Sequence, residues 1–428
     1  MWNKRIEKIP YTVRTFIKKC SHLAYRLDMR IYLVGGIVRD LILGRESFDY
    51  DIVVEGDAIE LCRVLSEESG VSFCRHHTFG TATVYYKNYK IDFATARKEF
   101  YPHRGALPKV EKAALVDDLF RRDFTINAMA VSINRDDYGK LIDLYGGYSD
   151  LRKGVVRVMH DNSFFDDPTR MLRAVRFEQR FSFKIEKHTF HLLKEASSQG
   201  VLKLIDEQRL RDELILILKE KKPLKYIRRI QNLMGFSFID DSLILKDKDY
   251  QLIRRAERAV MFYDKTFAGH RPLDVWLIYL MALLNRLSFK KILIFCKNFR
   301  LRKGEEKRLV SAFEHKNIIK GLYRKNIKKS KLFKLLTPLS FETIVFFYAC
   351  TTNKYARAHL VFFLKHLSCV KLKVSGHDLK RMHLEPHHLY SKALSELKHV
   401  KIEKGLYTKK EELQEISKIF KRLKRKRH

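Results

Sequence analysis

Two patterns of hydrophobic and polar positions divide the chain near residue 160. Before this point, short runs of β-branched and aromatic residues are separated by Gly, Asn and Asp, which predicts β-strands joined by tight turns. Between these runs, apolar residues recur at three- and four-residue intervals, which predicts helices. The strands are expected at 30–34, 50–54, 81–86 and 90–95, and the helices at 37–43 and 57–68. A small α/β domain should therefore form near the N-terminus.

After residue 160 the chain has helical spacing almost throughout. Its clearest segments are 171–181, 210–218, 275–287 and 341–350. The whole chain of 428 residues contains only eight prolines, so few of these helices should be interrupted. The predicted fold class is therefore an α/β domain followed by an all-α remainder.

The charge of the chain points to a polyanionic partner. Lys and Arg number 86 against 50 Asp and Glu, which gives a net charge of +36. Such a surplus attracts polyanions, of which nucleic acid is the commonest. The most apolar stretch, 275–284, is too short to span a bilayer, and the basic N-terminus lacks the continuous apolar segment of an export signal. We therefore expect a cytoplasmic protein that does not bind a membrane.

The strongest motif is LVGGIVRDLILGRESFDYDIVVEG at 33–56. Gly35 and Gly36 lie where a predicted strand turns into a helix. Glycines at such a turn let the backbone approach phosphate oxygens, and the helix N-terminus favours their negative charge. Arg39, on the first turns of this helix, could reach the same phosphates. These three residues are candidates for binding a triphosphate.

Asp49 and Asp51 alternate along the next strand, so their side chains should lie on the same face. Two adjacent carboxylates repel each other unless a cation lies between them. Mg²⁺ suits a sparse set of carboxylates completed by phosphate oxygens, and paired metal ions are an established solution for nucleotidyl transfer. Asp49 and Asp51 are therefore the predicted metal ligands, although an Asp-x-Asp sequence alone is common on exposed strands.

Together, the glycine pair and the aspartate pair resemble the signature of the DNA polymerase β-like nucleotidyltransferase superfamily. Twelve residues separate Gly36 from Asp49, and this arrangement is part of the resemblance. The resemblance implies a third acidic residue on a later strand, and Asp92 in KIDFATAR is the matching position. An aspartate at a strand edge that bonds to the backbone is the alternative for Asp92.

RRDFTINAMA at 121–130 narrows the resemblance to class II tRNA nucleotidyltransferases and bacterial poly(A) polymerases. Arg122 offers two parallel donors to a triphosphate or a carboxylate, and Asp123 could accept a hydrogen bond from a ribose hydroxyl. Asn127 is expected to hold a loop in place rather than to bind substrate.

DDPTRMLRAVRFEQRFSF at 166–183 begins a helix on which Arg170, Arg173 and Arg176 form one stripe. Asp167 and Arg170 can present an acceptor and a fork of donors to the Watson–Crick edge of C or A. The resemblance implies this role for the pair, with Arg173 and Arg176 supporting base or phosphate binding. In isolation the motif would instead be an Arg-rich helix paired with neighbouring acids.

EQRLRDELILIL at 207–218 resembles a further family motif, in which Arg209 and Glu213 support the base-reading helix without touching substrate. An ordinary ion pair between these residues, four positions apart on one helix, is the alternative.

The resemblance covers residues 30 to about 235 and implies an order of parts along the chain. A nucleotidyltransferase head at 26–158 would follow a helical leader at 1–25. A neck at 159–235 would recognise the nucleotide base, a helical body would occupy 236–345, and a basic helical tail at 346–428 would bind tRNA. The implied partners are tRNA, CTP and ATP; the oligomeric state is left open. Basic segments at 300–307, 324–334 and 418–427 are candidate tRNA contacts.

The activity within this family is predicted from two further segments. Bacterial poly(A) polymerases usually carry an arginine-rich strand where this chain has CRHHTFGTATV, and CC-only enzymes lack a flexible loop that residues 98–120 resemble. We therefore predict addition of C, C and A to the 3′ end of tRNA. An A-adding enzyme that completes CC-ended tRNA is the alternative, ahead of a poly(A) polymerase or an inactive RNA-binding relative. The inactive relative would lack Gly36, Arg39, Asp49 or Asp51, all of which are present.

Overall fold

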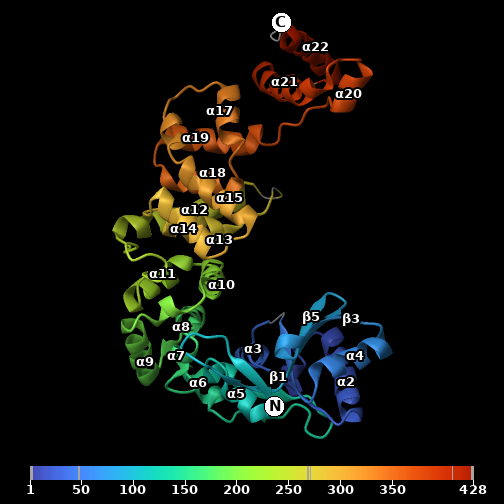
Figure 1. The fold of residues 1–428 in the computed structure, drawn as a ribbon, viewed down its shortest axis with the longest axis vertical. Helices are drawn as coiled ribbons and strands as arrows, with labels where there is room; N and C mark the ends of the chain where they lie inside the picture. Colours follow the sequence, from blue (N-terminus) through green and yellow to red (C-terminus); the bar gives the residue numbers. More distant parts are fainter. Residues whose placement is uncertain (1–2, 47–48, 268, 270, 407, 426–428) are drawn as a thin grey trace. The chain divides into compact units, whose positions relative to one another are not determined.

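The computed structural model describes residues 3–46, 49–267, 269, 271–406 and 408–425. The chain forms two compact units. Unit 1 comprises Met1–Ile217 and Lys225–Phe238, and unit 2 comprises Leu218–Leu224 and Ile239–His428. The described strands all lie in unit 1, whereas the described part of unit 2 is built from helices (Figure 1). The predicted order of an α/β domain and an all-α remainder is confirmed.

A seven-stranded mixed sheet lies at the centre of unit 1. Its order is β3-β4-β5-β2-β1-β8-β9, and β2 and β5 are parallel while the other neighbouring strands are antiparallel. The strands are β1 (Arg30–Val34), β2 (Tyr50–Glu55), β3 (Ser72–His76), β4 (Thr81–Tyr86), β5 (Tyr89–Thr95), β8 (Ala130–Ser132) and β9 (Leu141–Ile142). The four predicted strands correspond to β1, β2, β4 and β5, whereas β3, β8 and β9 were not predicted.

Helices cover the sheet because their apolar faces match its buried side chains. The helices here are α1 (Asn3–Ile6), α2 (Tyr11–Arg26), α3 (Gly36–Leu43) and α4 (Ala58–Ser69). α2 packs against β1 and α4, and its Phe16 and Ile17 are fully buried. The Asp57 carboxylate accepts from the amides of Ile59 and Glu60, which fixes the start of α4. The segment predicted as a leader therefore contributes to the core of the head.

Residues 98–120, predicted to resemble a flexible loop, fold as a hairpin and a helix. The hairpin is formed by β6 (Arg97–Phe100) and β7 (Lys109–Lys112), and α5 (Leu115–Phe120) follows it. The tip of the hairpin lies against residues farther along the chain, because the Gly105 amide donates to the Phe165 carbonyl at 3.2 Å. Arg104 donates to Gln199 at 2.9 Å.

The remainder of unit 1 connects the sheet to a group of helices. Its 3₁₀ turns are η1 (His77–Phe79), η2 (Thr125–Asn127) and η3 (Val201–Leu204), and its short paired strands are β10 (Val155–Val156) and β11 (Lys184–Ile185). The helices are α6 (Gly147–Lys153), α7 (Ser163–Asp166), α8 (Thr169–Phe181), α9 (Lys187–Ser198), α10 (Glu207–Leu218) and α11 (Pro223–Leu233).

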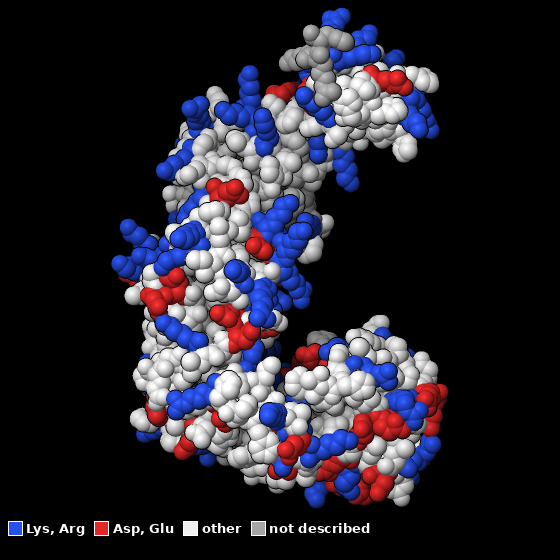
Figure 2. Space-filling model, in the orientation of Figure 1, with Lys and Arg blue, Asp and Glu red and all other residues white. Residues whose placement is uncertain are grey.

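The described part of unit 2 consists of helices around apolar cores. They are α12 (Asp247–Thr266), α13 (Val275–Leu283), α14 (Phe289–Asn298), α15 (Lys303–Glu314), α16 (Ile318–Gly321), α17 (Lys329–Leu336), α18 (Phe341–Cys350), α19 (Lys354–Phe362), η4 (Phe363–Leu367), α20 (Gly376–Arg381), η5 (His387–Leu389), α21 (Tyr390–Lys404) and α22 (Lys409–Arg425). Lys and Arg are spread over the visible face of this unit (Figure 2).

Among the described helices, none is by itself both long and apolar enough to cross a membrane. One bent pair, α17 with α18, meets these criteria jointly, by length and composition alone.

Candidate active site

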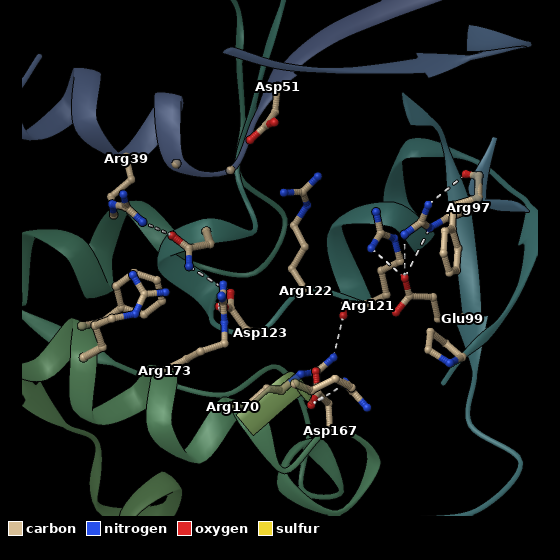
Figure 3. A pocket seen from close by; sticks show the side chains of 18 of the residues that line it. Arg39, Asp51, Arg97, Glu99, Arg121, Arg122, Asp123, Asp167, Arg170 and Arg173 are labelled. Atoms are coloured by element: carbon tan, nitrogen blue, oxygen red, sulfur yellow. Dashed lines mark hydrogen bonds and ion pairs between the residues drawn. The ribbon is translucent and has the colours of Figure 1, made fainter. Parts of the chain in front are cut away.

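A polar cavity of about 560 Å³ in unit 1 brings together predicted site residues from four of the sequence motifs. Residues from the sheet, from η2, from α8 and from α10 line it. Figure 3 shows Asp51 pointing into it from β2, Arg122 at its centre, and Asp167 and Arg170 on the side of α8. The predicted residues that line it are Gly35, Gly36, Arg39, Asp51, Arg122, Asp123, Asp167, Arg170, Arg173, Arg176 and Arg209.

At the first residue of the glycine turn, a side chain would collide with Arg122. Gly35 has φ 71° and ψ −127°, a conformation that L residues rarely adopt, and α3 begins directly after it. A Cβ atom on Gly35 would lie 2.7 Å from a terminal nitrogen of Arg122. The turn therefore places the backbone, the N-terminus of α3 and the Arg122 guanidinium side by side, an arrangement suited to an anion.

Arg122 is held in this position by a fully buried carboxylate. Asp118 on α5 accepts from Arg122 at 2.9 Å and from Arg121 at 2.7 Å. Burial alone would raise the pKa of Asp118, but these two guanidiniums hold it below its usual value. The Nε atom of Arg122 is buried and has no hydrogen-bond partner among the described residues. Because protein atoms enclose Nε, a ligand at the glycine turn would meet the terminal nitrogen of Arg122 that lies there.

Two of the three predicted carboxylates lie on neighbouring strands, and the third, Asp49, directly precedes β2. The parallel register of β2 and β5 places Asp51 beside Asp92. Desolvation raises the pKa of Asp51, and the charges of Asp92 and Asp49 raise it further against the opposing charge of Arg122. Asp92 accepts from Thr83 at 2.5 Å and from Lys90 at 2.6 Å, so its partners are side chains rather than the backbone of the alternative prediction.

This carboxylate cluster suits a divalent cation completed by substrate. A cation beside Asp49 and Asp51 would relieve the repulsion that raises the pKa of Asp51. Within the described residues, no group of three or more His, Cys, Asp or Glu side chains is arranged to hold a metal ion. Phosphate oxygens would have to supply the remaining ligands, as is usual for Mg²⁺.

Arg39 is buried and already has protein partners. Its guanidinium donates to Asn127 at 2.6 Å and to Asp40 at 3.0 and 3.1 Å. It also lies over the ring of Phe181, 4.8 Å from the centroid. Arg39 lines the cavity, but a direct contact with phosphate would require it to exchange one of these partners. That contact stays a prediction.

Asp123 and Asn127 form a buried network with α8. The Asp123 carboxylate accepts from Asn127 at 2.9 Å and from Arg173 at 2.8 and 2.6 Å. Burial alone would raise the pKa of Asp123, but the charge and hydrogen bonds of Arg173, with the Asn127 amide, lower it to about 2. Asp123 is therefore ionised and committed to Arg173, and its predicted bond to a ribose hydroxyl is untested.

The predicted base-reading pair lies at the start of α8. The Asp167 carboxylate makes its contacts through Oδ1, which accepts from the amide and hydroxyl of Thr169 and from Arg209. Arg170 is only 4% exposed and donates to Ser163 at 3.1 Å and to the Arg121 carbonyl at 2.9 Å. Neighbouring atoms therefore fix the direction of both side chains.

Residues of α10 contact the residues of α8 that they were predicted to support. Glu213 accepts from Arg173 at 2.9 Å and lies 3.4 Å from Arg176. Arg209 pairs with Asp167 at 2.8 Å and donates to the Gly105 carbonyl at 3.2 Å. The alternative, an ion pair within α10, is not formed, because each side chain is bound elsewhere.

Comparisons with known proteins agree with this geometry. The family model for the poly A polymerase head domain matches residues 31–157. The structure is similar to that of the Thermotoga maritima CCA-adding enzyme complexed with tRNA-CCA, with a TM-score of 0.71 and 31% identity over 96% of both chains. The chain belongs to the class II tRNA nucleotidyltransferase and poly(A) polymerase family. It therefore has the polymerase β-like head of that family, followed by helices.

Two curated family members are similar over most of this chain. The A-adding tRNA nucleotidyltransferase of Geobacter sulfurreducens is 33% identical over 87% of the chain, and that of Aquifex aeolicus is 36% identical over 83%. In each case the match spans 43% of the relative's own length.

One wall of the cavity in this tRNA nucleotidyltransferase family member was not predicted from the sequence. Glu99 on β6 accepts from Arg121 at 2.8 Å, from Arg97 at 3.2 Å and from Tyr101 at 3.0 Å. The Arg97 guanidinium lies 5.5 Å from the centroid of the Phe79 ring. Alternation in RKEFY, which places residues 97, 99 and 101 on one face of a strand, was the signal that could have revealed this wall.

Proposed function

We propose that this chain is a tRNA nucleotidyltransferase that transfers nucleotides from CTP and ATP to the 3′ end of tRNA. The observation that carries the proposal is that one cavity combines a glycine turn with Arg122, the carboxylate of Asp51, and the Asp167–Arg170 pair. These three features supply phosphate binding, metal binding and base recognition, which template-independent nucleotidyl transfer requires together. Cytoplasmic localisation stays a prediction.

The triphosphate would lie against Gly35, Gly36 and Arg122. The two glycines leave the backbone open to phosphate oxygens, and the N-terminus of α3 attracts their charge. Arg122 has a fixed position because Asp118 holds it, so little conformational entropy is lost when it binds an anion. Its charge would stabilise the negative charge that develops on the leaving pyrophosphate.

Asp49 and Asp51 would hold the divalent cation, for which we propose Mg²⁺. The chemistry that such a cation supplies is a lower pKa for the 3′-hydroxyl of the RNA and neutralisation of the phosphates. Asp92 lies beside Asp51 and adds negative charge next to the Asp49–Asp51 pair. Its bonds to Thr83 and Lys90 keep its carboxylate in place at the edge of the site.

Asp167 and Arg170 would choose the base. Both C and A carry an exocyclic amino group next to a ring nitrogen that accepts a hydrogen bond. Since Thr169 and Arg209 both contact Oδ1 of Asp167, Oδ2 would accept from this amino group. Arg170 uses one hydrogen on each terminal nitrogen for Ser163 and the Arg121 carbonyl, and a remaining hydrogen would be donated to the ring nitrogen. U and G present a carbonyl instead of the amino group and would leave Asp167 unpaired.

The likeness to the Thermotoga maritima enzyme, which matches over 96% of both chains, supports complete CCA addition. The second candidate is addition of the terminal A alone, and it is favoured by the two curated relatives named as A-adding. Both candidates share the ATP-dependent last step.

Single-nucleotide extension of three tRNA transcripts tests the proposal and separates the two candidates. The transcripts end at the discriminator base, at C and at CC, and each is incubated with Mg²⁺ and either CTP or ATP. Extension of the first two by CTP and of the CC end by ATP supports complete CCA addition. Extension of the CC end alone, by ATP alone, identifies an A-adding enzyme. No incorporation by the wild type, at the level of Asp49→Ala, would reject nucleotidyl transfer.

Base selection has a separate test in the same assay. Arg170→Ala should allow U and G to be incorporated more often while the affinity for tRNA is retained, because the lost donor faces the base and not the RNA. Unchanged selectivity in this variant would contradict the role of Arg170.

A further inference from the structure

The proposed function accounts for the phosphate cradle, the carboxylates and the base-reading pair but leaves an aromatic wall of the cavity without a role. Phe79, in the turn η1 between β3 and β4, lines the cavity and is 37% exposed. The Arg97 guanidinium covers part of the ring at 5.5 Å from its centroid. An exposed ring backed by a guanidinium is a surface on which a nucleic acid base can stack.

The Phe79–Arg97 pair is held in a defined position before any ligand binds. Arg97 donates to the Phe79 carbonyl at 3.0 Å, and its other nitrogens donate to Glu99 at 3.2 and 3.3 Å. Gly80 ends the turn with φ 58°, and its carbonyl accepts from the Thr95 amide at 3.0 Å. A base that stacks here would therefore not need to order the wall first.

The wall is placed to contact the end of the RNA rather than the incoming nucleotide. Figure 3 shows Arg97 and Glu99 on one side of the cavity and Arg39 and Arg173 on the other, with Arg122 between them. The incoming nucleotide is assigned to Gly35, Arg122, Asp167 and Arg170. Phe79 is not among the residues assigned to the incoming nucleotide, so the RNA can occupy its side of the cavity.

A second cavity, of about 350 Å³, adjoins the first at Asp51. It shares Asp51, Arg121 and Arg122 with the first cavity, and it is also lined by His76 and Thr81, which flank the Phe79 turn in the chain. The reaction needs one nucleotide on each side of the carboxylates: the incoming nucleotide, which brings the α-phosphate, and the end of the RNA, which brings the 3′-hydroxyl. The second cavity provides the space for the latter.

We propose that Phe79, backed by Arg97, is the stacking platform for the 3′-terminal base of the RNA primer. The terminal ribose then lies in the second cavity, with its 3′-hydroxyl directed toward Asp51. Stacking tolerates any base, so the platform positions discriminator, C and CC ends alike, while selection of the incoming base stays with α8. This inference rests on the proposed function and assigns the RNA side of the same site.

The test compares Phe79→Ala with a matched control on the neighbouring hairpin. Phe100 on β6 is 48% exposed, and its ring centroid lies 5.0 Å from Lys98 Nζ. The ring lines neither cavity, so Phe100→Ala removes an exposed aromatic side chain outside the site. We expect Phe79→Ala to raise the KM for a CC-ended tRNA about 5- to 100-fold, the range for loss of one stacked base. The KM for ATP and the choice of base should not change. Phe79→Trp should restore the KM for RNA, and Phe100→Ala should behave as the wild type.

A primer whose 3′-terminal nucleotide lacks its base separates stacking from a structural defect. The wild type should lose affinity for this abasic RNA to the same extent as Phe79→Ala loses affinity for the intact RNA. Phe79→Ala should suffer no further loss on the abasic RNA. If Phe79→Ala weakens binding of the intact and the abasic RNA by the same factor, or leaves the KM for the intact RNA unchanged, Phe79 does not stack on the terminal base.

Binding without catalysis keeps this inference distinct from the proposed function. If the wild type binds the transcripts in fluorescence anisotropy but transfers no nucleotide, the proposed function fails. The Kd values of the wild type and Phe79→Ala for intact and abasic RNA then still decide whether the ring binds the terminal base.

Discussion

At the scale of single residues, Arg173 connects three segments of unit 1. It donates to Asp123 at 2.8 and 2.6 Å and to Glu213 at 2.9 Å, and all three residues are largely buried. Buried ions of this kind are stable only as a complete set, because removal of one leaves an uncompensated charge. The network therefore fixes α8, which carries Arg170 and begins two residues after Asp167, relative to the segment that holds Arg122.

The pKa of Asp123 gives this network a pH dependence. Its value of about 2 lies below the ordinary 3.8, so the folded state favours the ionised form. The resulting stability is fully present above pH 4 and is lost as the pH falls toward 2. Asp123→Asn should therefore lower the free energy of unfolding at pH 7 by about 2 kcal/mol. The difference between variant and wild type in the free energy of unfolding, measured in urea, should be constant down to about pH 4 and should shrink as the pH falls from there toward 2; a constant difference over the whole range would contradict this account.

The sequence predicts which residues of α8 lie together but not what they bind. The three-residue spacing of Arg170, Arg173 and Arg176 places them on one stripe, and the structure has this stripe in the cavity. The partners of Arg173 come from positions 50 and 40 residues away along the chain. Only the tertiary fold brings such positions together, so local spacing cannot reveal them.

At the scale of elements, the packing of α6 against η2 supports the phosphate cradle. A Cβ atom on Gly147, in the first turn of α6, would lie 2.1 Å from the Thr125 carbonyl oxygen and 2.9 Å from Met129 Cγ. The Met129 carbonyl accepts from the Gly35 amide at 3.3 Å, and Asn127 holds Arg39. A shift of η2 would therefore reach the glycine turn directly.

Gly147→Ala should destabilise the protein and weaken nucleotide binding together. Overpacking of a well-packed site costs about 1–3 kcal/mol, and the Thr125 carbonyl belongs to the backbone and cannot rotate away. We expect a lower Tm and a higher KM for ATP. Gly304→Ala on α15 is the control, because no atom lies within 4 Å of its added Cβ and alanine favours a helix. An unchanged Tm for Gly147→Ala would show that α6 can move away from η2 at little cost.

Strongly patterned elements could be predicted from the sequence, and weakly patterned ones could not. β1, β2, β4 and β5 have clear apolar runs, whereas β9 has two residues and no side chain of β3 is fully buried. The hairpin at 97–112 was missed because its strands are mostly charged and their alternation marks a cavity wall rather than a hydrophobic core.

At the scale of the whole molecule, the basic residues that give the net charge of +36 lie on surfaces outside the cavity as well as in the cavity itself. Unit 2 contains a groove between α17 and α21 that is lined by Lys331, Lys334 and Lys392 together with histidine and serine side chains and one carboxylate, Glu396, which is paired with Arg422. These lysines are exposed, and no acidic partner is found for them among the described residues. Lys331 and Lys334 fall within the basic segment 324–334, one of the predicted tRNA contacts.

Binding of tRNA should therefore depend steeply on salt, and the groove should account for part of that dependence. Each phosphate neutralised by a lysine releases condensed counterions and contributes about 0.7–0.9 to the slope of log K against log salt. Replacement of Lys331, Lys334 and Lys392 by Ala should reduce the slope by about 2–3. Removal of the same charge from exposed positions in unit 1, by Lys18→Ala, Lys19→Ala and Lys87→Ala, should leave the slope nearly unchanged. Because both triple variants carry the same net charge, equal slopes would mean that total charge attracts the RNA and that the groove does not bind it.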